Sequence, residues 1–326
     1  MNINKSLSGI FLALTISAIS ANSMAALQKF ETSGDSETLC GYKNAQGRVV
    51  VPAKYQHCGD FYDGRAYVSV MKIVKAKGLD DYDDYIYLQG YIDEAGKLII
   101  PTEHEAVVGE YSVIKYRNFS DGLVAVYKNG KYGYLDKNGK LVIPYSYESA
   151  GNFNGGVAAV SKNGKFGVIN KANKLIVPFK FNWLEDYSEG LAAYKTTSLY
   201  DEGKFGFIDP TGKIVIPARW NEVYPFSEGL AAVSAGGKNS KWGIIDKTGK
   251  VIVVPTYDTV FVQYTADAIP EGDGIYKNGK LDVYRLNNQT KDGGYKGITR
   301  YTLNRSGKVM TKKTFPDWND IINARQ

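Results

Sequence analysis

One short segment recurs six times along the chain and constrains the fold more than any other feature. Each copy carries a glycine in its second position and continues approximately as x-D-x-x-G-K-x-x-I-P, for example YGYLDKNGKLVIPYSY from Tyr132. The opening glycines are 34 to 49 residues apart, at Gly41, Gly90, Gly133, Gly167, Gly206 and Gly243. Because self-similarity at such a period is typical of tandem repeats, each copy is predicted to be one structural unit that packs on its neighbours.

A second segment recurs between these copies, for example FSDGLVAVYK from Phe119 and FSEGLAAVSA from Phe226. Its apolar run, the LVIP-type run of the first segment and the Asn-Gly or Thr-Gly turns all indicate short strands joined in hairpins. Proline cannot donate to a ladder, so the proline of each LVIP-type run is expected where the second strand ends. The only helical segment expected is a short turn at 317–324.

These units predict an all-β fold of tandem three- to four-stranded antiparallel meanders. A β-propeller-like arrangement is favoured because radial closure protects the sheet edges. An open β-hairpin solenoid is the alternative, since it absorbs unequal spacings more easily. The predicted boundaries are a leader at 1–25, an N-terminal extension at 26–39, six repeats at 40–281, and a degenerate seventh repeat with a tail at 282–326.

The aromatic-Gly pair and the x-D-x-x-G-K-x-x-I-P core resemble the WG-repeat family, over about residues 40 to 310. Trp242-Gly243 reproduces the pair that names the family, while Tyr132, Phe166 and Phe205 substitute another aromatic residue. Gln89 and Cys40 depart from it. The resemblance implies a bacterial repeat protein, and it supplies no catalytic residues that could be assigned to positions in this chain.

The first 25 residues indicate export. A weakly basic start is followed by the apolar run 7–19 and by Ser23-Met24-Ala25, which places small residues where a signal peptidase cleaves. We therefore expect a periplasmic or extracellular protein with no membrane span. Export also permits oxidation, so Cys40 and Cys58 are predicted to form a disulfide across a hairpin of the first unit, with a free thiol as the alternative.

The repeats provide an internal control, because a residue type present in every copy serves folding rather than a single active site. On this basis the carboxylates of the Asp-Gly and Glu-Gly turns are assigned to turn hydrogen bonds; they are Asp63, Asp121, Glu189 and Glu228. The lysines of the Gly-Lys turns, Lys97, Lys140, Lys213 and Lys250, are assigned to solvated turns.

Departures from the repeat are the candidate sites. An acidic insertion at 78–87 could be a partner loop or a cation site, through Asp80, Asp81, Asp83 and Asp84. His104, beside Glu103 and Glu105, replaces a packing aromatic. Aromatic side chains crowd the segments after the second strands and could form a binding surface or a core; they are Trp183, Trp220, Tyr224, Phe179 and Tyr145.

No known catalytic, metal-binding or cofactor motif is present, and no cofactor is expected. The formal net charge of +6 is too mild and too dispersed to indicate nucleic-acid binding. The sequence thus favours a non-enzymatic envelope protein that binds a protein partner, of a periplasmic immunity or regulatory type. A cell-wall glycan binder is the alternative and requires Trp183, Trp220 and Tyr224 to be exposed in a groove. A hydrolase centred on His104 is the less favoured reading.

Overall fold

The computed structural model describes residues 27–33, 38–74, 84–108, 114–115, 117–197, 202–237, 239–260, 277–287 and 296–323. Within these residues the chain is built almost entirely of antiparallel strands, which group into seven consecutive units that we call blades. The fold is therefore all-β, as the repeats predicted. No helix in this part of the chain is long and apolar enough to cross a membrane.

The strands of each blade follow one another along the chain. The first blade contains β1 (Gln28–Ser33), β2 (Thr38–Lys43) and β3 (Val49–Tyr55). The second contains β4 (His57–Cys58), β5 (Arg65–Val74), β6 (Asp84–Asp93) and β7 (Leu98–Glu105). The third contains β10 (Leu123–Lys128), β11 (Lys131–Asp136) and β12 (Leu141–Tyr147), and the pair Tyr127↔Glu105 joins it to the second. Between them, β8 (Val107–Val108) pairs with β9 (Ile114–Lys115).

The later blades repeat the same order. The fourth contains β13 (Ser149–Ala150), β14 (Val157–Lys162), β15 (Lys165–Asn170) and β16 (Leu175–Phe181). The fifth contains β17 (Trp183–Leu184), β18 (Ala192–Lys195), β19 (Phe205–Ile208) and β20 (Ile214–Trp220). The sixth contains β21 (Glu222–Val223), β22 (Leu230–Ala235), β23 (Lys241–Asp246) and β24 (Val251–Tyr257). The seventh contains β25 (Lys280–Leu286), β26 (Ile298–Asn304) and β27 (Val309–Phe315), followed by helix α1 (Trp318–Asn323).

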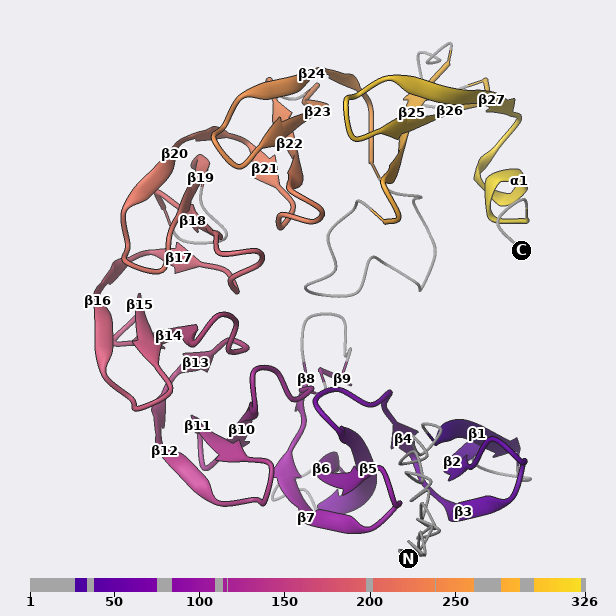
Figure 1. Ribbon diagram of the computed structural model, residues 1–326, viewed down its shortest axis with the longest axis vertical. Coiled ribbons are helices and arrows are strands. Elements are labelled where there is room, and N and C mark those ends of the chain that lie inside the picture. Colours follow the sequence, from indigo (N-terminus) through magenta and orange to yellow (C-terminus); the bar gives the residue numbers. More distant parts are fainter. Residues whose placement is uncertain are drawn as a thin grey trace, which may run out of the picture.

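The blades lie side by side along an arc (Figure 1). The two-residue strands β13, β17 and β21 face the inside of the arc, and the last strand of each blade forms its outer rim (Figure 1). The arc is propeller-like but open, because the first blade and α1 lie on opposite sides of a gap (Figure 1).

A blade is out of phase with the sequence repeat. In the fourth blade, β14 comes from the second recurring segment, whereas β15 and β16 come from the next copy of the first segment. The turn between β14 and β15 contains Asn163 and Gly164, both with positive φ, as a tight hairpin requires. The predicted extension before the first repeat likewise contains β1, which is the first strand of the first blade.

The recurring glycine is explained by a β-bulge at the outer strand. Register shifts occur beside this position, for example between Tyr132 and Tyr134, and bring the outer strand close to the glycine backbone. A Cβ atom on Gly133 would lie 2.6 Å from the carbonyl oxygen of Ile143. Corresponding contacts of 2.3 to 2.7 Å recur at the other five opening glycines. The proline predicted to end the second strand instead lies within the outer strand, where its missing N–H can face solvent.

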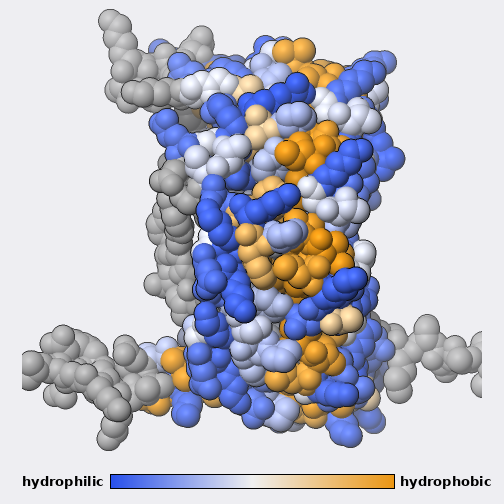
Figure 2. Space-filling model, turned by 90° about the vertical axis from the view of Figure 1, so that its left-hand side faces the viewer, coloured by the Kyte–Doolittle hydropathy of each residue, from blue (hydrophilic) through white to orange (hydrophobic). Residues whose placement is uncertain are grey.

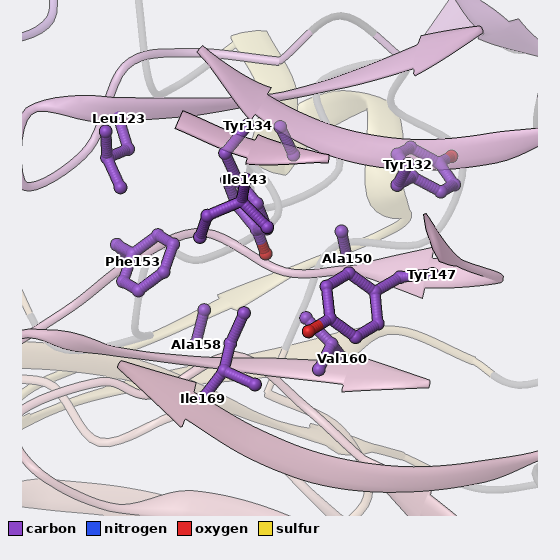
Figure 3. Close-up of a cluster of buried hydrophobic side chains, with 11 residues drawn as sticks. Leu123, Tyr132, Tyr134, Ile143, Tyr147, Ala150, Phe153, Ala158, Val160 and Ile169 are labelled. Atoms are coloured by element: carbon purple, nitrogen blue, oxygen red, sulfur yellow. The ribbon is translucent and has the colours of Figure 1, made fainter. Parts of the chain in front are cut away.

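Hydrophobic cores fill the spaces between neighbouring blades. Figure 3 shows the core between the third and fourth blades, where Tyr134 and Ile143 face Phe153, Ala158 and Ile169. Equivalent clusters join each of the other consecutive pairs, and among the described residues no such cluster joins the first blade to the seventh. Helix α1 instead covers the face of the seventh blade that points away from the sixth blade. There Trp318 and Ile321 pack on Tyr284 and Phe315. Each blade thus depends on its sequence neighbours.

The outer rim carries a stripe of apolar side chains (Figure 2). The first residue of each outer strand is an exposed aliphatic residue: Val49, Leu98, Leu141, Leu175, Ile214, Val251 and Val309. Each follows an exposed Lys or Arg, namely Arg48, Lys97, Lys140, Lys174, Lys213, Lys250 and Lys308. These lysines are therefore at the exposed turns where the sequence analysis placed them.

Candidate functional site

The recurring carboxylates join neighbouring blades. The Asp121 carboxylate accepts a hydrogen bond from the backbone N–H of Gly156 in the next blade at 2.6 Å, and it pairs with Lys171 of that blade at 2.7 Å. Glu189 accepts from Gly229 at 2.9 Å and pairs with Lys247 at 3.1 Å. The assignment to hydrogen bonding at turns therefore needs correction in one respect: the bonds reach the turn of the following blade.

The same contact recurs at two further boundaries. Glu228 accepts from Gly279 at 2.7 Å and from Arg305 at 2.9 Å, and Asp63 accepts from Gly122 at 2.7 Å. At the boundary between the fourth and fifth blades both partners change together, since Gly155 takes the carboxylate position and Pro210 the basic position. We call these contacts the interblade latches. Because they recur, they belong to the scaffold.

Three of the latches, those of Asp121, Glu189 and Glu228, lower the pKa of their carboxyl groups. The Lys171 hydrogen bond holds the pKa of Asp121 below its ordinary value, and the Arg305 hydrogen bond does the same for Glu228. For Glu189, partial burial alone would raise the pKa, but the Gly229 N–H and Lys247 outweigh it and the pKa is lowered. These groups are therefore ionised at neutral pH and engaged, which is opposite to what a general acid requires.

Aromatic contacts also cross the blade boundaries. The residue after the opening glycine packs edge-on against the aromatic residue that begins the next blade's Phe-Ser-Asp-Gly type segment, with ring centroids 4.8 to 5.6 Å apart. The four pairs are Tyr42–Phe61, Tyr91–Phe119, Tyr134–Phe153 and Phe207–Phe226. In addition, the Tyr134 hydroxyl donates to the Gly151 carbonyl of the next blade at 2.7 Å. The recurring aromatics are thus packing residues.

The aromatic cluster that the sequence offered as a binding surface lies in the cores. Trp220 is 6% exposed and belongs to the core between the fifth and sixth blades. Trp183, Tyr224, Phe179 and Tyr145 are half-buried and pack against separate interblade cores. Burial, together with Glu222, raises the pKa of Tyr224 to about 12. The glycan-binding alternative required Trp220 to be exposed in a groove. That prediction is wrong, because the Trp220 ring fills the space between the fifth and sixth blades.

His104 also lies in a core position. It is 5% exposed on β7, and its Nδ1 atom is 3.4 Å from the Tyr145 hydroxyl. Burial lowers its pKa despite the nearby carboxylate of Glu103, so the ring is neutral at pH 7. Glu103 and Glu105 themselves are exposed. In the part of the chain that the structure describes, no three His, Cys, Asp or Glu side chains are grouped to hold a metal ion. His104 therefore takes the position of a packing aromatic residue.

Cys40 and Cys58 form a disulfide, with their Cα atoms 6.0 Å apart. The sequence placed this bridge across one hairpin, but Cys40 lies on β2 of the first blade and Cys58 on β4 of the second. Both sulfurs border the core between these blades. The bond therefore fastens the first blade to the second.

The strands that flank the acidic insertion in sequence form an extended hairpin. Asp80, Asp81 and Asp83 are outside the described residues, and Asp84 begins β6. β5 and β6 pair over ten residues, compared with six in the equivalent hairpin of the fourth blade. Near the tip, Ile73 pairs with Tyr85, and their side chains are 55% and 54% exposed. We call residues 71–74 and 84–87, with the loop between them, the β5–β6 arm.

Comparison with known sequences identifies the repeat. The sequence model of a family described as WG containing repeat matches residues 41–70, 110–132, 132–166, 166–200, 205–238 and 242–262. These matches cover more than half of the chain. The chain belongs to the WG repeat family. No curated protein sequence shows significant similarity to it.

Solved structures extend the comparison to the fold. The crystal structure of a eukaryotic initiation factor aligns with 88% of this WG repeat chain and 74% of its own, at 11% identity and a TM-score of 0.53. TolB from Acinetobacter baumannii aligns with 89% of this chain and 79% of its own, at 12% identity and a TM-score of 0.34. The first likeness describes a shared fold and nothing of activity. The second is too distant to support an argument.

The WG repeat model does not match every part of the chain. It leaves residues 71–109 unmatched, a stretch that contains the arm and β7, and also residues 263–326, which include the seventh blade. In other blades two aromatic residues pair across the last two strands, as Tyr132 and Tyr147 do in the third blade. In the second blade Gln89 on β6 and His104 on β7 take these two positions. The Gln89 amide donates to the Arg117 carbonyl at 2.7 Å, so the departure is compensated by hydrogen bonding. The unusual spacing of 49 residues was the sequence signal for the arm, but the exposure of Ile73 and Tyr85 was not predicted.

Proposed function

We propose that this WG repeat protein is a non-enzymatic scaffold of the bacterial envelope that binds a protein partner through the β5–β6 arm. In this role it resembles a periplasmic immunity-type or regulatory protein. The observation that carries the proposal is the exposed Ile73–Tyr85 pair on a hairpin that, among the described residues, pairs over more positions than the equivalent hairpin of any other blade. Aromatic and aliphatic side chains at the centre of an exposed patch are typical of protein interfaces.

The sequence of the arm carries both signs of charge as well as the apolar Ile73–Tyr85 pair. Residues 71–87 contain Lys72, Lys75 and Lys77 and also Asp80, Asp81, Asp83 and Asp84, three basic against four acidic side chains. A segment with both signs of charge favours a partner surface of complementary charge pattern, and such complementarity fixes orientation more than it raises affinity. An envelope location is supported by the predicted leader at 1–25 and by the Cys40–Cys58 disulfide, which is stable in oxidising compartments.

A non-enzymatic role is supported by the engagement of the recurring groups. The carboxylates of the latches are held by glycine N–H groups and by Lys or Arg, and His104 is neutral and buried. The Asp121 and Glu189 carboxylates are thus held in their ionised form by cationic partners, and the His104 ring contacts the Tyr145 hydroxyl at a core position. The scaffold therefore supplies shape and rigidity, and recognition is assigned to the arm.

The proposal is tested by affinity capture from envelope extract with the mature chain and two variants. The arm variant carries Ile73→Ser and Tyr85→Ser. The control variant carries Leu175→Ser and Ile214→Ser, which removes two other exposed apolar side chains, 42% and 51% exposed, from the outer rim. We expect one specific protein, identified by mass spectrometry, to be captured by wild type and the control and lost from the arm variant. Equal capture by all three proteins would refute recognition by the arm.

A further inference from the structure

The inner edge of β1 differs from that of the equivalent strands in other blades. In four blades a two-residue strand covers this edge, with the pairs Cys58↔Val68, Ala150↔Val160, Leu184↔Tyr194 and Val223↔Val233. In the seventh blade a bridge from Thr259 to Tyr284 does so. In the first blade β1 is the edge strand, and among the described residues no segment pairs with it on that side.

The register identifies the equivalent position in β1. Val68, Val160 and Val233 each pair with the opening glycine of their blade on the other side, and in the first blade Phe30 pairs with Gly41. Phe30 therefore corresponds to these valines. The inner segment of the fourth blade donates N–H groups to the carbonyls of Ala159 and Ser161 at 2.8 and 2.9 Å. The corresponding groups in β1 are the carbonyls of Lys29 and Glu31.

With the predicted cleavage after Ala25, too few residues precede β1 to supply this strand from the position that the other blades use. In all four complete blades the inner residue precedes its partner by ten positions. Ten positions before Phe30 is Ser20, which lies in the predicted leader. Cleavage after Ala25 would remove it. Cleavage therefore leaves Lys29 and Glu31 without the segment that their counterparts have.

We propose that the inner edge of β1 binds an extended segment of a partner protein, which adds to the first blade as its missing antiparallel strand. The proposal rests on the proposed function, because it adds a second contact for the same class of partner. Strand addition draws affinity from main-chain hydrogen bonds, and β1 lacks the proline that protects most of the outer strands. We expect the partner residue opposite Phe30 to be apolar, because the residues at the equivalent inner position of other blades are Cys58, Ala150, Leu184 and Val223.

The probe is a synthetic peptide with the sequence of residues 146–153, SYESAGNF, which contains the inner strand of the fourth blade. Its matched control carries proline in place of Gly151, whose N–H donates to the Ala159 carbonyl in the fourth blade. Binding to the mature chain is measured by NMR, together with amide hydrogen exchange. We expect saturable binding of the first peptide and slower exchange at Lys29 and Glu31, whose N–H groups point to the same side as their carbonyls.

Variants separate strand addition from other contacts. Lys29→Pro removes the N–H on the open side while leaving the β2 ladder paired, and Lys29→Ala is its control. We expect Lys29→Pro to weaken peptide binding roughly tenfold and Lys29→Ala to leave it unchanged. If Lys29→Pro unfolds the blade, the proline peptide gives the same comparison on the wild-type protein.

Three results would overturn the proposal: no binding at millimolar peptide, equal binding of the proline peptide, or protection of Lys29 and Glu31 by dimerisation without peptide. The arm variant distinguishes the two proposals. If it fails to capture the partner but still binds the peptide, recognition by the arm and strand addition at β1 both hold. If it captures the partner normally and the peptide still binds, the assignment of recognition to the arm fails and strand addition holds.

Discussion

At the scale of single residues, the molecule is specified by glycines that no other residue can replace. The opening glycine of each repeat allows the outer strand to approach its backbone at a bulge, and this explains why glycine is the fixed member of a pair whose aromatic partner varies. The sequence identified these positions as a repeat signature. It could not reveal the physical cause, because the carbonyl that excludes a side chain at Gly133 belongs to Ile143, ten residues later.

Gly133→Ala is expected to destabilise the third blade by about 1–3 kcal/mol, since the added Cβ would lie 2.6 Å from a backbone oxygen and the strand must shift. The measurement is the urea midpoint of unfolding. Gly237→Ala is the matched control, because its Cβ would meet nothing within 4 Å. Similar losses in both variants would contradict the bulge explanation.

The latch carboxylates predict a dependence of stability on pH. The folded-state pKa values of Asp121 and Glu189 are lowered, so their contribution is present above the unfolded pKa and is lost as the pH falls through the folded pKa. We expect stability to fall between about pH 5 and pH 3, and to fall less in the variant Asp121→Asn/Glu189→Gln, whose amides can still accept the glycine N–H. Urea unfolding at pH 7 and pH 3 tests this, and an unchanged pH dependence in the variant would exclude the latches as its source.

At the scale of elements, hairpins were predictable and their grouping into blades was less so. Asn129-Gly130 and Asn163-Gly164 indicated tight turns, and the structure confirms positive φ at all four residues. The short helix expected at 317–324 is confirmed as α1, and Asp317 accepts a hydrogen bond from the Asp320 N–H at its start. The inner strands escaped prediction because two residues carry no periodicity. The latches escaped prediction because their partners lie 35 to 77 residues apart in the sequence.

The disulfide gives a prediction for the first two blades. Cys40→Ser with Cys58→Ser is expected to lower the free energy of unfolding by about 2–4 kcal/mol, because the bridge restricts the unfolded chain. Amide hydrogen exchange should accelerate first in β1, β2 and β3, since this blade has a single neighbour. Uniform acceleration across all blades would show that the bridge does not act locally. Reduction of the wild-type protein should reproduce the effect.

At the scale of the whole molecule, contacts between consecutive blades stabilise the fold, and the two end blades are stabilised by different means. The first blade is held by a covalent bond, and the seventh is covered by α1. The sequence left propeller and solenoid open because every repeat looks alike whether or not the ends meet. The structure shows an open arc because Trp318 and Ile321 of α1 cover the face of the seventh blade against which the first blade would have to pack in a closed ring.

Trp318→Ala is expected to destabilise the seventh blade by about 3–5 kcal/mol, since it removes a buried ring from the surface of Tyr284. Exchange of the β25, β26 and β27 amides should accelerate while β1, β2 and β3 remain unaffected. Acceleration in both end blades together would indicate that they contact each other, which would contradict the open arc. Trp318→Phe, which retains an aromatic ring, serves as the milder control.

An arc that does not close has no preferred number of members. A closed ring must satisfy a fixed total rotation, so gaining or losing one blade would strain every boundary. Here a duplication within the chain would lengthen the arc by one blade and disturb only the two boundaries that flank the insertion, as long as the bridged start and the helical end are kept. Such a protein can change in size by unequal recombination between its own repeats, and we expect viable versions of this architecture to differ by whole blades.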